Sequence, residues 1–253
     1  MNINFAGLEI AGESNAGPVR HHNEDNFLIY APPGGSAVLA AVADGIGGHS
    51  RGEVASYICC RELLAAAREV DSSRWDAGFL RSALTYANDR IFDFNFNGRR
   101  VKPMGCTVAA AIFTLREVIC AYAGDSRIYE FYRTAGRKPL RQLSVDHRPE
   151  GYDEMRKTGR LQHTSFVSRS LGTAKYLNLD MQTVARMPEA RYILCSDGLY
   201  NRQPEQLLSG VLGGDDFSPR KAVNRLIRGA LLAGEKDNIT IICAASAALK
   251  KEI

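Results

Sequence analysis

An unbroken run of small and apolar residues that stops at a polar turn is the clearest pattern in the chain. Residues 36–43 (SAVLAAVA) contain one serine at their start and no charge, and Asp44 and Gly45 follow directly. A short apolar run bounded by turn residues is typical of a strand buried on both faces. We therefore predict a buried strand over residues 36–43 that ends at a functional loop.

Helical periodicity occurs in two pairs of segments. Apolar residues recur at intervals of three and four through residues 51–70 and again through residues 75–96, which predicts two long helices packed on a sheet. Residues 204–211 and 219–232 each carry a proline at or near their first turn, a favoured position in a helix. We expect helices in these four segments.

The middle and the end of the chain show the composition of strands. Apolar and aromatic runs separated by short connections occupy residues 107–114, 117–123 and 127–132, and further runs of this kind occupy residues 177–185, 191–195 and 238–245. Such consecutive runs favour an antiparallel meander over repeated βαβ units. Together with the helices, they predict a layered α+β fold with sheets in the centre and helices outside. Since no repeat or long linker interrupts the chain, we expect one domain over residues 1–253.

Composition narrows the functional classes. The net charge of +4 is spread along the chain, so nucleic-acid binding has little support. The six cysteines form no CxxC pair and mostly lie in apolar runs, which favours core residues in a reducing compartment over a zinc site or disulfides. No apolar run reaches the ~20 residues that cross a bilayer, and the first residues do not resemble a signal peptide. We expect a soluble, cytoplasmic protein without a membrane partner.

Five acidic residues beside turn-forming residues carry the candidate chemistry. They are Glu24, Asp25, Asp44, Asp197 and Asp237. Carboxylates at strand ends are the hard oxygen ligands that Mg²⁺ and Mn²⁺ require, and the Arg20 guanidinium suits a phosphate dianion. Asp and Gly in loops are usually turn formers, but three separate segments agree here. The set predicts a metal-dependent phosphate site.

The same residues belong to a series of motifs that resembles a known family. After Arg20, the motifs are Asn23-Glu24-Asp25, Asp44-Gly45-Ile46-Gly47-Gly48-His49, Gly105-Cys106-Thr107, Ala123-Gly124-Asp125-Ser126-Arg127, Asp146-His147-Arg148-Pro149, Ser168-Arg169-Ser170-Leu171-Gly172, Ser196-Asp197-Gly198 and Asp237-Asn238-Ile239-Thr240. Their order, from about Ala16 to about Cys243, resembles the bacterial branch of the PP2C (PPM) serine/threonine phosphatases. The resemblance implies a central β-sandwich of two mainly antiparallel sheets flanked by pairs of helices, in four αββα layers.

The resemblance also implies a site with two Mg²⁺ or Mn²⁺ ions. In it, Asp44 would bridge both ions, and Asp197 and Asp237 would complete the ligands of one. Glu24 and the backbone carbonyl of Gly45 would hold the other. Asp25 would orient water on the metal or share the ligand role with Glu24, and the sequence leaves that division open. Asp125 has two interpretations, a ligand of a third, weaker ion together with Asp197 or simply part of a hairpin turn.

The expected chemistry needs no side-chain nucleophile. Two adjacent ions lower the pKa of water, and the hydroxide that results can attack phosphorus in line. Consistently, Cys195 lacks the arginine of a Cys-x5-Arg phosphatase loop, and Arg20 would clamp the phosphate oxygens. The leaving alkoxide needs a proton from a general acid. Ile46 stands where many eukaryotic members have a histidine, so His49 or a water molecule would be the acid.

These observations favour a protein phosphatase that hydrolyses phosphoserine and phosphothreonine, with a Ser/Thr kinase as its natural counterpart. A non-catalytic phosphoprotein-binding module is one alternative, which the complete carboxylate set disfavours. A hydrolase of small phosphoesters or nucleotides is another, and only the resemblance separates it from the first hypothesis.

Overall fold

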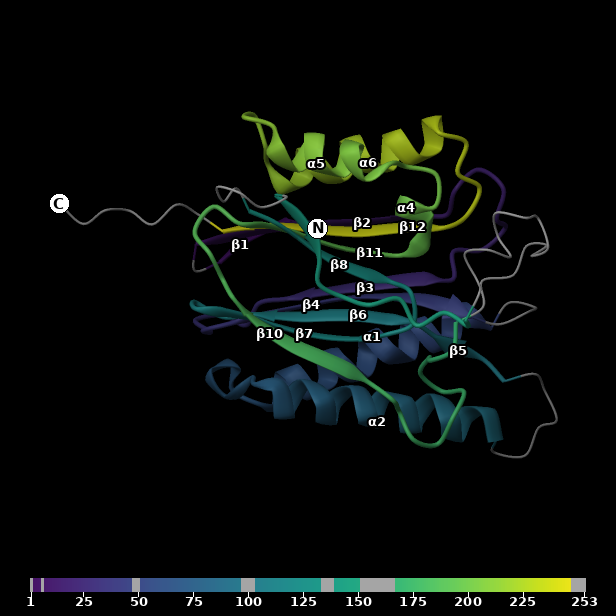
Figure 1. Cartoon of the computed structure of the whole chain (residues 1–253). Coiled ribbons are helices and arrows are strands. Elements are labelled where there is room, and N and C mark those ends of the chain that lie inside the picture. The colour runs from purple at the N-terminus through teal and green to yellow at the C-terminus, as the bar shows by residue number, and fades with distance from the viewer. Residues whose placement is uncertain are drawn as a thin grey trace.

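Four layers make up the molecule. The computed structural model describes residues 2–5, 7–46, 51–96, 103–132, 139–150 and 167–246. In this part of the chain, two antiparallel sheets lie face to face, and helices cover the outer face of each (Figure 1). The expected α+β sandwich is therefore confirmed.

Each sheet draws its strands from distant parts of the chain. The first sheet has the order β1 (Asn2–Phe5), β2 (Leu8–Asn15), β12 (Ile239–Ser246), β11 (Arg191–Cys195), β8 (Arg127–Phe131) and β9 (Leu140–Gln142). The second has the order β10 (Asp180–Ala185), β7 (Glu117–Ala123), β6 (Val108–Phe113), β4 (Val38–Ile46) and β3 (Asp25–Tyr30), and β5 (Gly105–Cys106) pairs with the end of β4. All the pairings within these sheets are antiparallel.

Strand β4 shows why its sequence is apolar without alternation. Val38 and Val42 point into the core between the two sheets. Leu39 and Ala41, the residues between them, belong to the core under the helices. Because successive side chains of a strand point to opposite faces, a strand in the middle of four layers buries all of them.

The helices form the two expected pairs. Helices α1 (Gly52–Glu69) and α2 (Ala77–Phe96) pack together on the second sheet, and α5 (Glu205–Gly213) and α6 (Pro219–Leu232) pack together on the first. At the start of α6 the Ser218 side chain accepts a hydrogen bond from the amide of Lys221, and Pro219 takes the first helical position. None of the described helices has the length and apolarity needed to cross a membrane.

Several boundaries differ from those expected. Strand β4 continues to Ile46, so Asp44 and Gly45 lie in a strand instead of the expected loop. Pairing with β3 on one side and β5 on the other extends it. Helix α2 begins at Ala77, two residues late, because a 3-10 turn at Ser72–Arg74 precedes it. Strand β10 begins at Asp180 instead of residue 177.

All six cysteines are buried and unpaired, as core residues. Cys59 and Cys106 lie under the helices of the second sheet, and Cys195 and Cys243 lie under those of the first. The prediction of small core residues is confirmed.

Candidate metal centre

The acidic residues gather at one end of the sandwich. Asp25 opens β3 and lies opposite Asp44 in the register of β3 and β4. Asp197 opens the short helix α4 (Asp197–Tyr200) directly after β11, and Asp237 lies two residues before β12. Helix α4 and strand β5 mark this end in Figure 1. Both sheets therefore contribute carboxylates to the same edge.

The carboxylates of Asp25 and Asp197 are almost completely buried and that of Asp44 is half-buried, and the three repel one another. Burial raises the pKa of Asp25 to about 6. Burial, followed by the charges of Asp125 and Asp237, raises the pKa of Asp197 to about 7. Burial and the charges of Asp25 and Asp197 hold the pKa of Asp44 well above its ordinary range. Buried like charges of this kind are typical of sites that hold a cation.

This donor set fits hard divalent cations. Carboxylate oxygens are the ligands that Mg²⁺ and Mn²⁺ prefer, and a backbone carbonyl beside them can contribute as well. Within the described residues, no three histidine, cysteine or acidic side chains are already drawn together around an ion position. Since the carboxylates repel one another, we expect them to close in around the cations that neutralise them.

A chain of hydroxyl groups orients Asp25. The Ser196 hydroxyl donates to Oδ2 of Asp25 over 2.7 Å and accepts from the amide of Thr240 at 2.9 Å. The Thr240 hydroxyl lies 2.6 Å from that of Ser14. The sequence alone did not predict a role for Ser14, Ser196 or Thr240. The positions of Ser196, directly before Asp197, and of Thr240, two residues after Asn238, could have indicated that these hydroxyl groups support the carboxylates.

Asn238 fixes the loop that carries Glu24. Its Oδ1 accepts a hydrogen bond from the Glu24 amide at 2.9 Å. Its Nδ2 donates to the carbonyls of Ala16 and His22, at 2.9 and 3.1 Å. On the other side, the Glu24 carbonyl accepts from the Ser56 hydroxyl at 2.6 Å. One side chain thus ties the start of β12 to the loop before β3. Burial raises the pKa of the Glu24 carboxyl, although the Arg20 charge opposes this effect.

Two glycines allow the segments to approach this closely. A Cβ atom on Gly45 would lie 2.3 Å from the carbonyl carbon of Gly52 and 2.6 Å from the carbonyl oxygen of Glu24. A Cβ on Gly198 would lie 2.0 Å from the carbonyl oxygen of Asn238. Larger residues would push apart the segments that carry Glu24, Asp197 and Asp237.

Arg20 lies at the exposed side of the site. Its Nη2 is 2.7 Å from Oδ2 of Asp237, and about half of its side chain is open to solvent. Partial burial lowers its pKa, but the hydrogen bond and charge of Asp237 and the charges of Glu24 and Asp44 outweigh this effect and raise the pKa overall. The guanidinium is therefore held beside the carboxylates by Asp237, with about half of its side chain facing solvent.

Asp125 is buried close to Asp197 but already has a cationic partner. Two nitrogens of Arg148, Nε and Nη2, lie 3.2 and 3.1 Å from its Oδ2. Burial raises the pKa of Asp125, and the Arg148 charge partly offsets this effect. The motif around Asp125 is therefore more than a hairpin turn, since the Asp125 carboxylate belongs to a buried ion pair with Arg148.

The proposed general acid cannot be placed. His49 lies outside the described residues, which resume at Arg51 after Ile46. Its role stays a prediction.

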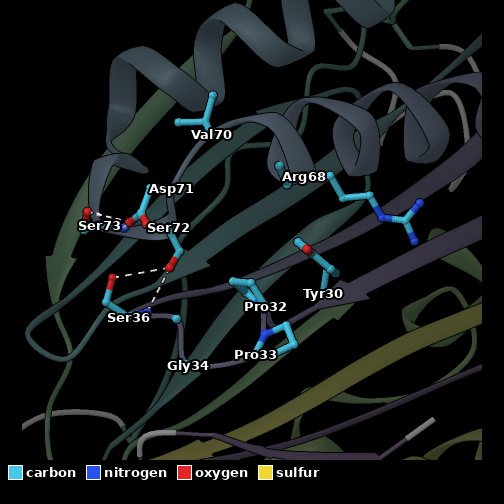
Figure 2. A pocket seen from close by; sticks show the side chains of 12 residues that line it. Tyr30, Pro32, Pro33, Gly34, Ser36, Arg68, Val70, Asp71, Ser72 and Ser73 are labelled. Carbon is cyan, nitrogen blue, oxygen red and sulfur yellow. Dashed lines mark hydrogen bonds between the residues drawn. The ribbon is translucent and has the colours of Figure 1, made fainter.

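A surface cavity of about 410 Å³ lies away from the carboxylates. The loop between β3 and β4 and the end of α1 line it, including Tyr30, Gly34 and Ser72 (Figure 2). Tyr30 ends the strand that Asp25 begins, so the cavity lies at the opposite end of β3. The Ser72 hydroxyl already accepts from the amide of Ser36 at 2.9 Å. This cavity is therefore separate from the metal centre.

Comparisons with known proteins agree with this geometry. A family model described as Protein phosphatase 2C matches residues 19–251. The serine/threonine phosphatase stp of Listeria welshimeri is 31% identical over 237 residues, which span 89% of this chain and 91% of that protein. The crystal structure of the Mycobacterium tuberculosis serine/threonine phosphatase PstP/Ppp has a TM-score of 0.76 at 28% identity, and the match covers 95% of this chain and 99% of that one. A structure of the PstP catalytic domain in complex with two manganese ions has a TM-score of 0.75 at 28% identity, with 95% and 98% covered. The chain belongs to the protein phosphatase 2C family.

Proposed function

We propose that the protein hydrolyses phosphoserine and phosphothreonine in other proteins, with two Mn²⁺ or Mg²⁺ ions as cofactors. The observation that carries this proposal is the meeting of Asp25, Asp44, Asp197 and Asp237 at one edge of the two sheets. The names of the similar proteins, which are serine/threonine phosphatases, support the substrate class. The two manganese ions of the PstP catalytic domain support the cofactor.

In this proposal, each carboxylate has a defined task. Asp44 would contribute to holding both ions, since the charges of Asp25, Asp197 and Asp237 all act on it. Asp197 and Asp237 would hold one ion. Glu24 and the Gly45 carbonyl would hold the other, and Asp25 would serve as a further ligand or as an acceptor for water. When bound, the ions supply a hydroxide nucleophile at neutral pH and neutralise charge that develops on the phosphoryl group.

The side chains themselves bind and orient the substrate. Arg20 is exposed, charged and held beside Asp237, so it offers two parallel N–H groups to the phosphate oxygens. The nearby thiol is unsuited to attack phosphorus, because burial raises the pKa of Cys195 to about 12. The neighbouring Ser196 hydroxyl is engaged by Asp25 and by the Thr240 amide. These contacts support direct attack by water without a phosphoenzyme.

Hydrolysis of a phosphothreonine peptide tests the proposal. We expect the wild type to release phosphate with Mn²⁺ or Mg²⁺ and to stop in EDTA. Asp197→Ala should lose the activity seen with Mn²⁺ and with Mg²⁺, and Asp216→Ala, a change of an exposed aspartate, should keep it. A wild type that binds Mn²⁺ but cleaves no phosphopeptide would contradict the proposal. Cleavage of small phosphoesters alone would then indicate a different hydrolase.

The physiological substrate class follows from the same proposal. We expect a Ser/Thr kinase as the counterpart and the cytoplasm as the location, both of which rest on the family resemblance. A phosphorylated kinase activation loop should be a better substrate, by kcat/KM, than a scrambled phosphopeptide of equal charge. Equal values would remove the support for a kinase counterpart.

A further inference from the structure

We propose that Arg148 is a built-in counter-ion for Asp125 and keeps a third metal ion from binding beside Asp197. This inference rests on the proposed two-metal function and concerns the carboxylate next to that centre. In this proposal, Arg148 limits the number of metal ions that the protein binds to two.

The ion pair between Arg148 and Asp125 is almost completely buried. Nε and Nη2 of Arg148 both lie near Oδ2 of Asp125, at 3.2 and 3.1 Å. Only 9% of the Arg148 side chain and 3% of the Asp125 side chain are exposed. Charged groups are buried to this degree when they are paired, because a lone charge loses its hydration without compensation. The guanidinium is therefore the resident cation of Asp125.

Neighbouring groups fix the guanidinium in this position. The Tyr200 hydroxyl accepts a hydrogen bond from Nη2 of Arg148 at 2.8 Å and donates to the backbone carbonyl of Asp125 at 2.7 Å. Asp146 lies 3.6 Å from Nε of Arg148, and Arg127 grips Asp146 with two hydrogen bonds of 2.9 and 2.7 Å. Because every contact restrains the planar fork, moving Arg148 aside would break several bonds together.

The charges in this cluster balance without a metal ion. Arg127, Asp146, Arg148 and Asp125 alternate in sign along a chain of contacts. The Arg148 charge thus offsets part of the negative charge that Asp125 would otherwise offer to a divalent cation. Both guanidinium groups also lie near the Tyr200 ring, that of Arg127 3.5 Å and that of Arg148 5.7 Å from the ring centroid, which adds cation–π attraction.

A divalent ion at Asp125 would therefore meet opposition. Asp125 and Asp197 are close enough for the charge of one to act on the other, so without Arg148 the two carboxylates would present neighbouring negative charges to a cation. With Arg148 in place, the same ion would lie next to a desolvated positive charge, and such repulsion is strong where water is excluded. Removal of the guanidinium should open the position.

Counting bound Mn²⁺ tests the proposal without any substrate. The full-length protein is titrated with Mn²⁺, and free Mn²⁺ is followed by electron paramagnetic resonance. We expect two ions in the wild type. Arg148→Ala should bind a third, with a dissociation constant at least about 10-fold lower than that of any third ion in the wild type. Arg148→Lys, which keeps the charge, should remain close to the wild type.

Two further variants separate this role from a structural one. Arg141→Ala removes another paired arginine, the partner of Glu130, and should leave the count at two. Adding Asp125→Asn to Arg148→Ala should abolish the third ion. Crystals of the wild type and of the folded variants soaked in Mn²⁺ provide an independent readout, because anomalous scattering locates each bound ion.

The proposal is overturned if the wild type holds a third Mn²⁺ on Asp125 with Arg148 displaced. An unchanged third-ion affinity in a folded Arg148→Ala variant would overturn it as well. Failure of the wild type to release phosphate would count against the proposed function, and the metal count would still decide the role of Arg148.

Discussion

The ionised form of the buried Asp197 carboxylate is unfavourable in the metal-free protein. Its carboxylate is buried next to the charges of Asp125 and Asp237, which together with burial raise its pKa to about 7. Folding therefore becomes less favourable as this group ionises. A ligand that binds the ionised form reverses the effect, so the residue trades stability of the metal-free protein for metal affinity.

The change Asp197→Asn should separate stability from activity. In the metal-free protein at pH 7 we expect the free energy of unfolding to rise by about 2 to 4 kcal/mol, because the amide removes a buried carboxylate whose pKa is raised to about 7. Activity should be lost. Urea denaturation in EDTA measures the first effect, and phosphate release with Mn²⁺ measures the second. The matched control Asp216→Asn, at an exposed ion pair, should leave stability nearly unchanged, because solvent screens such a pair. A destabilised, metal-free Asp197→Asn protein would refute this account.

Asn238 shows what a residue behind the ligands contributes. Asn238→Ala removes the acceptor of the Glu24 amide and the donor to two carbonyls. We expect a loss of about 2 kcal/mol of stability and about 10-fold weaker Mn²⁺ binding, because the loop that carries Glu24 loses its anchor. Isothermal titration with Mn²⁺ checks the affinity, and circular dichroism confirms the fold. Unchanged Mn²⁺ affinity would show that Asn238 has no part in positioning Glu24.

The sequence indicates the carboxylates more readily than the residues that support them. Asp44, Asp197 and Asp237 stand beside turn-forming residues, and this local pattern predicts them. Asn238 acts on Glu24, 214 positions away. Similarly, the Ser196 hydroxyl reaches Asp25 across 171 positions. No local pattern reports such contacts, because only the pairing of distant strands creates them.

At the scale of elements, close approach of backbones positions the centre. Helix α4 meets the start of β12 at Gly198, and β4 meets the start of α1 at Gly45 and Gly52. The helices and central strands could be predicted because their apolar periodicity is strong. β2, β3 and the two-residue β5 were not predicted, since β2 and β3 mix polar with apolar residues and β5 exists only through its pairing with β4.

Two glycine substitutions should have opposite effects. Gly198→Ala places a methyl group 2.0 Å from the Asn238 carbonyl, and we expect a loss of about 2 to 4 kcal/mol together with most of the activity. Gly210→Ala, in helix α5, meets no atom within 4 Å and should gain about 0.5 to 1 kcal/mol, since alanine favours helices. Thermal melts of the two variants compare them directly. A neutral Gly198→Ala would contradict the close contact between α4 and β12.

At the scale of the whole molecule, the metal centre links the two sheets. Asp25 and Asp44 come from the second sheet, and Asp197 and Asp237 adjoin strands of the first. The cations proposed to bind among them would join both layers at one edge, so we expect metal affinity and global stability to be coupled. Sequence alone predicted this edge through the resemblance of its motifs. The raised pKa values depend on burial among neighbours, and only the folded molecule provides them.

The stability of the metal-free protein should therefore fall as the pH rises. Asp25 and Asp197 have folded-state pKa values of about 6 and about 7, and that of Asp44 is raised as well. Between about pH 4 and pH 7 the folded state binds more protons than the unfolded state, so the free energy of unfolding decreases with pH. Bound Mn²⁺ acts in the opposite sense, since it needs the ionised carboxylates and adds about 3 kcal/mol at a hundredfold excess over its dissociation constant.

Urea denaturation at pH 5, 6, 7 and 7.5, with EDTA or with Mn²⁺, measures both effects. We expect the difference between the two series to be small at pH 5 and largest at pH 7.5. In EDTA, the decrease of the free energy of unfolding with pH should be smaller for Asp197→Asn, because this variant lacks one of the titrating groups. A free energy of unfolding in EDTA that rose from pH 5 to pH 7 would mean that these carboxylates already have compensating partners in the folded chain. Their mutual repulsion would then no longer support a metal centre.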